Sequence, residues 1–131
     1  MSIFFSGNEL VEIAIGIEEN GLAFYESAAN KTQNPEAKVI YNYLAGEEKK
    51  HLITFQNMQK TIGQYQPPES YSGEYMHYLK ALVDSHVFSN TKEAQEKADM
   101  APNEINALNI GIQAEKDSIF FYSEMQKLVR E

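Results

Sequence analysis

Three long stretches of the chain carry apolar residues at intervals of three and four, which places those residues on one face of an α-helix. The stretches cover about residues 8–31, 35–62 and 104–131. Prolines and glycines fall mostly where the patterns stop. Asn34-Pro35-Glu36 supplies a capping residue, a proline for the first helical position and an acidic first turn. Pro102-Asn103-Glu104 similarly precedes the third stretch, so the sequence predicts an all-α fold.

The connections between these predicted helices differ in length. Only Thr32-Gln33 separates the first two, and a connection this short makes two long helices antiparallel neighbours. Pro67-Pro68 lies in a polar and aromatic segment that predicts a surface loop. After it come a weak helical pattern from Gly73 to Val87 and a polar helical turn or two from Thr91 to Asp99. We expect these segments to form a long crossover between the second and third long helices.

Composition narrows the functional classes. A chain of 131 residues and 14.9 kDa fits a single domain. Its formal net charge of −8 argues against nucleic acid or an anionic membrane as partner, and the absence of cysteine excludes disulfides, thiolate catalysis, cysteine-ligated zinc and Fe–S centres. No apolar run approaches the roughly 18 residues of a membrane span, and the N-terminus lacks the basic start and apolar core of a signal peptide. We expect a soluble, cytoplasmic protein.

Glutamates occupy the middle of all three apolar stripes: Glu18, Glu48 and Glu115. An unpaired carboxylate in an apolar interior costs several kcal/mol, and His51 is the only basic residue in the stripes. A shared metal ion is the simplest remedy. His51 follows Glu48 by three residues, so both side chains lie on one helical face, one turn apart. Several carboxylates with one imidazole favour iron or manganese over zinc or copper(I). The alternatives to a metal site are that His51 is a hydrogen-bonded core histidine and that the acids have a purely structural role.

An internal repeat joins the first and third predicted helices. A shift of 97 residues superposes residues 114–122 on residues 17–25, so that the glutamate and the Phe-Tyr pair of each segment coincide. The match suggests duplicated helical hairpins, with coincidence as the alternative. Tyr25 and Tyr122 each follow the repeated glutamate by seven residues, two turns along the same face. Each phenol could donate a hydrogen bond to a carboxylate, or each ring could simply be part of the core.

These motifs resemble those of the ferritin-like di-iron carboxylate bundles, most closely the rubrerythrin-related branch that lacks a rubredoxin domain. The resemblance covers about residues 8–131 and rests on three segments: Ile17-Glu18-Glu19 to Phe24-Tyr25, Glu47-Glu48-Lys49-Lys50-His51, and Ala114-Glu115 to Phe121-Tyr122. In that family, a glutamate from each of two helices and a Glu-x-x-His from each of the other two hold a pair of metal ions. The resemblance therefore implies an antiparallel helical bundle with a long crossover.

The resemblance also assigns roles by position. Glu18 is similar to a terminal ligand of one metal, Glu48 to a bridge, His51 to the imidazole of the first metal and Glu115 to the terminal ligand of the second. Tyrosines at the positions of Tyr25 and Tyr122 usually donate hydrogen bonds to such ligands. The implied cofactor is iron, with manganese or zinc as alternatives. The implied chemistry is peroxide reduction or ferrous-iron oxidation with peroxide or dioxygen, using a separate electron donor or ferrous iron itself, as in a rubrerythrin-like peroxidase or ferroxidase.

One departure from the family pattern is large. A second Glu-x-x-His would lie 30 and 33 residues after Glu115, whereas the sequence ends at Glu131. The fourth long helix is thus absent from this chain, and the single ferritin-like domain of residues 1–131 looks incomplete at its C-terminus. We expect an apolar groove along the three helices. The chain is part of a longer polypeptide, borrows a helix from another subunit of a homo-oligomer, or has become a metal-poor structural domain.

A different class of function stays open at this point. A non-catalytic helical interaction module would oligomerise through the open groove and leave the metal ligands unfilled. His77 and His86 have no regular spacing to the three acids, so we assign them no role. A zinc hydrolase fits one histidine and several glutamates poorly.

Overall fold

The computed structural model describes residues 7–62, 81, 86, 88 and 90–128. Four helices account for nearly all of these residues: α1 (Gly7–Lys31), α2 (Pro35–Ile62), α4 (Thr91–Met100) and α5 (Glu104–Leu128). The described part of the chain is therefore all-α, as the sequence predicts. The three long helices begin within one residue of the predicted positions, and the short polar helix expected from Thr91 is present. The pattern predicted for residues 73–87 lies mostly outside the described residues.

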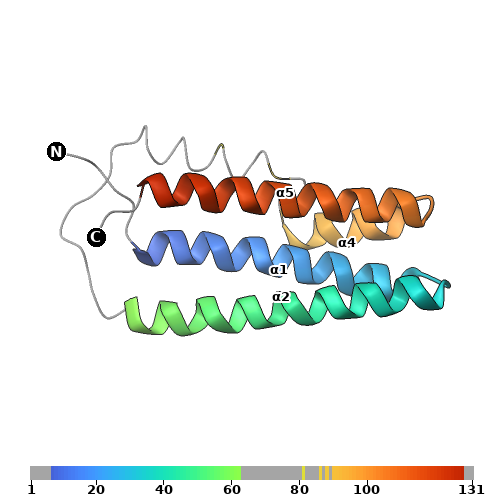
Figure 1. Ribbon diagram of the computed structural model, residues 1–131, viewed down its shortest axis with the longest axis horizontal. Helices are drawn as coiled ribbons and strands as arrows, with labels where there is room; N and C mark the ends of the chain where they lie inside the picture. Colours follow the sequence, from blue (N-terminus) through green and yellow to red (C-terminus); the bar gives the residue numbers. More distant parts are fainter. Residues whose placement is uncertain (1–6, 63–80, 82–85, 87, 89, 129–131) are drawn as a thin grey trace.

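The long helices lie side by side along one direction, with α1 next to both α2 and α5 (Figure 1). Residues 32–34 join α1 to α2, which makes this pair antiparallel. The C-terminal end of α5 lies beside the N-terminal end of α1, so α1 and α5 are antiparallel as well. The arrangement is that of a ferritin-like bundle, and it brings the middle of all three long helices to the same level.

Asparagine caps decide where three of the helices begin. Asn34 Oδ1 accepts hydrogen bonds from the backbone N–H of Glu36 (2.9 Å) and Ala37 (3.1 Å). Asn90 caps α4 and Asn103 caps α5 in the same way, each accepting from an N–H at 2.8 Å. Each side chain satisfies a donor that the helix itself leaves unpaired, which explains why these boundaries can be predicted from the sequence.

Small residues let the short helix α4 approach α1 closely. Ala94 and Ala98 of α4 are completely buried and belong to the same core cluster as Ala28 of α1. Just before α4, the ring of Phe88 stacks on the ring of Phe24 with centroids 5.0 Å apart. The end of the crossover is thereby fixed against α1.

The apolar face predicted for the third helix is divided in the structure. Ala107, Gly111 and Phe121 turn toward the core of the bundle. Ile112 and Ile119, which the same pattern places in the core, are 53% and 65% exposed. Large apolar residues are also exposed on α2, among them Ile40 and Met58. Among the described residues, apolar surface of both α2 and α5 is therefore left uncovered, and we call the surface around Ile40, Met58, Ile112 and Ile119 the open face.

A membrane-spanning role finds no support among the helices that the structure describes, since none is both long enough and apolar enough to cross a bilayer.

Candidate metal centre

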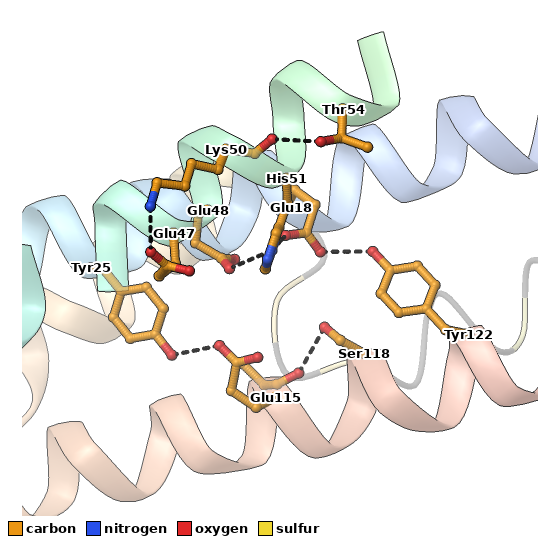
Figure 2. Close-up of polar contacts among 11 residues, drawn as sticks. Glu18, Tyr25, Glu47, Glu48, Lys50, His51, Thr54, Glu115, Ser118 and Tyr122 are labelled. Atoms are coloured by element: carbon orange, nitrogen blue, oxygen red, sulfur yellow. Dashed lines mark hydrogen bonds and ion pairs between the residues drawn. The ribbon is translucent and has the colours of Figure 1, made fainter. Parts of the chain in front are cut away.

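The middle of the bundle holds a compact group of two carboxylates and one imidazole. Glu18 projects from α1, and Glu48 and His51 project from α2 (Figure 2). One potential ligand atom from each of the three lies within 4.8 Å of the others. His51 Nδ1 is 2.9 Å from Glu18 Oε1 and 3.5 Å from Glu48 Oε1, so the ring nitrogen lies between the two acids. The structure therefore brings these three sequence-predicted residues together.

Burial differs sharply within the group. Glu18 is 3% exposed and Glu48 is 7% exposed, whereas the side chain of His51 is 54% exposed. Both carboxylates are therefore removed from water, and the imidazole is the solvent-exposed member of the group.

A glycine on α1 makes room for Glu48. A Cβ atom at Gly21 would overlap Glu48 Oε2 and lie 3.2 Å from its carboxyl carbon. Glu48 therefore reaches over α1 at a point where no side chain intervenes. The sequence analysis did not identify Gly21. A glycine on the helical face of a predicted ligand, three residues after Glu18, was the available signal.

Two tyrosines link the helices in a reciprocal way. Tyr25 of α1 donates a hydrogen bond to Glu115 Oε2 of α5 at 2.8 Å, and Tyr122 of α5 donates to Glu18 Oε2 of α1 at 2.7 Å (Figure 2). Each phenol thus binds the glutamate of the other copy of the 97-residue repeat. Of the two alternatives left by the sequence, the structure shows the hydrogen-bonded one for both residues. Tyr25 also belongs to the core cluster, whereas the partly buried ring of Tyr122 packs against Phe55 and Phe121.

Glu115 differs from the interior position expected for it. It is exposed, unlike Glu18 and Glu48, because it lies on the open face of α5 next to Ile112 and Ile119. The apolar stripe around it is not covered by the described residues, so membership of that stripe does not bury it. Its bond to Tyr25 nevertheless aims the carboxylate toward the same centre (Figure 2).

The electrostatics of the site are those of acids confined together. Burial, and then the charges of Glu18 and Glu115, raise the pKa of Glu48 to about 9. Burial and the neighbouring carboxylates also raise the pKa values of Tyr25 and Tyr122 far above the usual value for a phenol. Both phenols consequently remain protonated donors, and without a cation Glu48 holds a proton at neutral pH.

The donor set fits a hard or borderline metal cation. Two buried carboxylates, a third carboxylate close by and one imidazole nitrogen are ligands that iron and manganese accept. The lysine ion pairs recorded nearby, Lys49 with Glu26 and Lys50 with Glu47, lie on the surface and do not neutralise the buried acids. A bound cation would compensate the charge that the described side chains leave uncompensated.

The other polar residues singled out by the sequence lie outside this group. Glu19 is exposed, and Glu47 pairs with Lys50 at 3.1 Å. His77 lies outside the described residues. His86 packs against Phe121 with ring centroids 5.9 Å apart and lines a cavity that the sequence analysis did not foresee.

The raised pKa of Glu48 predicts a pH dependence of stability in the metal-free protein. Between the ordinary carboxyl pKa near 4.5 and the folded value of about 9, the folded chain keeps a proton that the unfolded chain releases. The contribution of Glu48 to the free energy of unfolding is fully present below pH 4.5 and is lost as the pH rises through 9. We expect the unfolding temperature in chelator to fall from pH 5 to pH 9, and Glu48→Gln, which is neutral at every pH, to flatten this decline.

Thermal unfolding followed by circular dichroism measures the effect. Glu47→Gln removes the adjacent, surface-paired carboxylate and is the matched control. Its decline should stay close to that of the unchanged protein, because the charge of Glu47 is the smallest of the influences that raise the pKa of Glu48. Parallel curves for the Glu48→Gln variant and the unchanged protein would show that Glu48 is ionised in the folded state.

Comparison with known proteins agrees with this geometry. The family model for rubrerythrin matches residues 9–131, which include all four glutamate and histidine positions of the site. Searches of curated proteins and of solved structures each found no match. The match spans nearly the whole sequence and coincides with an all-α bundle that carries a candidate carboxylate and histidine metal site. The chain belongs to the rubrerythrin family.

Proposed function

We propose that this chain binds iron through Glu18, Glu48, His51 and Glu115 and that the bound iron carries out redox chemistry, either peroxide reduction or ferrous-iron oxidation. The observation that carries the proposal is the convergence of Glu18, Glu48 and His51 within 4.8 Å in the interior of a rubrerythrin-family bundle. Manganese and zinc are compatible with the same donors.

Each residue has a distinct part in the proposed site. His51 Nδ1 and one oxygen from each of Glu18 and Glu48 surround a single position, so these three would hold the first metal. The charges of both Glu18 and Glu115 raise the pKa of Glu48, so Glu48 lies close to both acids, which suits a bridging role between two metals. Glu115 would be the terminal ligand of the second metal; among the described residues, the one group that could hold a metal ion is Glu18, Glu48 and His51.

The tyrosines position the ligands. Tyr122 fixes one oxygen of Glu18 and leaves the other toward His51. Tyr25 fixes one oxygen of Glu115 in the same manner. Hydrogen bonds of this kind hold a carboxylate in the orientation in which it binds a metal.

Charge and protons balance within the site. Glu48 must release its proton when a cation binds, because the proton and the cation compete for the same oxygens. Ferrous iron, when bound, would supply electrons either to peroxide or to dioxygen. With no cysteine in the sequence, electrons would come from a separate protein or from ferrous iron itself.

Replacement of the ligands tests the proposal. We expect the unchanged chain to bind ferrous iron under anaerobic conditions and the Glu48→Ala and His51→Ala variants to bind it at least about tenfold to a hundredfold more weakly, because each change removes a donor atom. Elemental analysis after desalting and calorimetric titration measure the stoichiometry and affinity.

Glu47→Ala is the matched control because Glu47 adjoins Glu48 in sequence but pairs with Lys50 on the surface. Iron binding should survive this change. Tight binding in the combined Glu48→Ala and His51→Ala variant would place the metal elsewhere and contradict the assignment.

Gly21 provides a subtler test of the same geometry. In the Gly21→Ala variant the new methyl group would displace the carboxylate of Glu48, while alanine favours the helix more than glycine does by about 1 kcal/mol. We expect unchanged or increased helicity together with weaker ferrous binding. Gly16→Ala, with no atom within 4 Å of the added Cβ, is the control and should keep normal binding. Equal affinity in the two variants would show that Glu48 does not need its observed position.

A second candidate function is supported by the open face. Ile40 and Met58 on α2 and Ile112 and Ile119 on α5 are all more than 40% exposed, a grouping that is unusual on a soluble monomer. We propose that this face also serves association, which is compatible with metal binding. Light scattering on the 131-residue chain should show self-association at micromolar concentration that is weakened by Ile112→Glu and Ile119→Glu. A clean monomer would remove this role.

A further inference from the structure

A cavity of about 370 Å³ lies between α1 and α5, beneath the residues that lead into α4. Buried Glu48 and exposed Glu115 both border it. Asn90 and Thr91, both exposed, border it where the crossover enters α4. The cavity therefore connects the surrounding solvent with the carboxylates of the proposed metal site.

The walls between these two ends are mostly apolar. Ile17 is buried on α1, Phe88 is buried on the crossover, and Ala114 contributes from α5. Gly16 and Gly21 widen the cavity because neither carries a side chain. Polar side chains of α1, α5 and the crossover also line the cavity, but most of its exposed wall surface is apolar, and a compact hydrocarbon group loses unfavourable contact with water there.

The size of the cavity sets the size of its occupant. An apolar cavity of about 150 Å³ is large enough to hold benzene, and ligand pockets begin at roughly 300 Å³. The space between α1 and α5 thus admits one ring or a short branched alkyl group, with an oxygen-bearing end directed at Glu48 and Glu115.

We propose that this cavity binds the organic part of a hydroperoxide, so that the oxidant reduced at the site is an organic hydroperoxide, R–O–OH, with a compact apolar R group. The inference rests on the proposed function, because the reacting oxygens would lie at the carboxylate end. Two ferrous ions, one hydroperoxide and two protons give two ferric ions, one alcohol and one water; the O–O bond breaks, and each iron supplies one electron.

The first test uses metal-free protein and the product-like alcohol 2-phenyl-2-propanol, titrated by NMR. A leucine at position 16 would project into open space, since no atom lies within 4 Å of a Cβ there, and would fill the cavity. Gly46→Leu is the matched control: it also replaces a helical glycine with open space around its Cβ, and Gly46 does not line the cavity. We expect Gly16→Leu to weaken alcohol binding by at least about tenfold and Gly46→Leu to leave it unchanged.

A second variant guards against misfolding. Ala114→Leu narrows the same cavity from α5, and circular dichroism verifies the helicity of each variant. The proposal would be overturned if the unchanged protein failed to bind the alcohol. It would also be overturned if the folded Gly16→Leu and Ala114→Leu variants bound the alcohol as tightly as the unchanged protein does.

A second measurement uses ferrous-loaded protein. Stopped-flow oxidation by cumene hydroperoxide is compared with oxidation by hydrogen peroxide, and the ratio of the two rates should fall at least about tenfold in Gly16→Leu. An unchanged ratio would overturn the assignment of the substrate class. If the unchanged protein does not bind iron, the proposed function fails. The alcohol titration would still decide whether the cavity is a binding site.

Discussion

The burial of Glu18 and Glu48 beside each other is the constraint on which the site depends. Two carboxylates removed from water repel each other and lose hydration, and the raised pKa of Glu48 is the direct consequence. A proton on Glu48, the imidazole of His51 and the phenol of Tyr122 relieve this strain in the metal-free chain. A cation would relieve it more completely, since it neutralises both acids at once. Burying two neighbouring carboxylates destabilises the metal-free chain, and the same arrangement is therefore suited to binding a metal cation.

The two tyrosine bonds explain how three helices hold this site without a lysine or arginine in it. Tyr25 and Tyr122 connect α1 and α5 in opposite directions, so displacement of either helix disturbs both carboxylates. The reciprocity follows from the 97-residue repeat, because antiparallel copies of one Glu–Tyr motif place the tyrosine of each copy beside the glutamate of the other. The repeat thereby gives the site an approximate twofold symmetry that includes α1 and α5.

The carboxylates can be reached from two parts of the molecular surface. On one side, the exposed face of α2 and α5 leaves His51 and Glu115 near solvent. On the other, the cavity beneath the crossover reaches Glu48 and Glu115 between apolar walls. The first side is suited to a macromolecular surface because it is long and lined by large aliphatic residues. The second is suited to a small molecule because its volume is limited and Phe88, packed on Phe24, restricts its outer wall.

The sequence by itself determined the long helices, the Asn34 cap and the placement of a glutamate within each of three apolar stripes. Local periodicity and the Asn–Pro signals depend only on neighbouring residues, and the Glu48–His51 spacing is a property of a single helix. Tertiary structure decided which of the predicted stripe residues became buried. Glu115 and Ile119 share a helical face with apolar neighbours, yet both are exposed because burial depends on what packs against a helix, which periodicity cannot specify. The roles of Gly21 and of the cavity beside His86 likewise arise only when α1, α2, α5 and the crossover meet, because each consists of distances between residues far apart in the sequence.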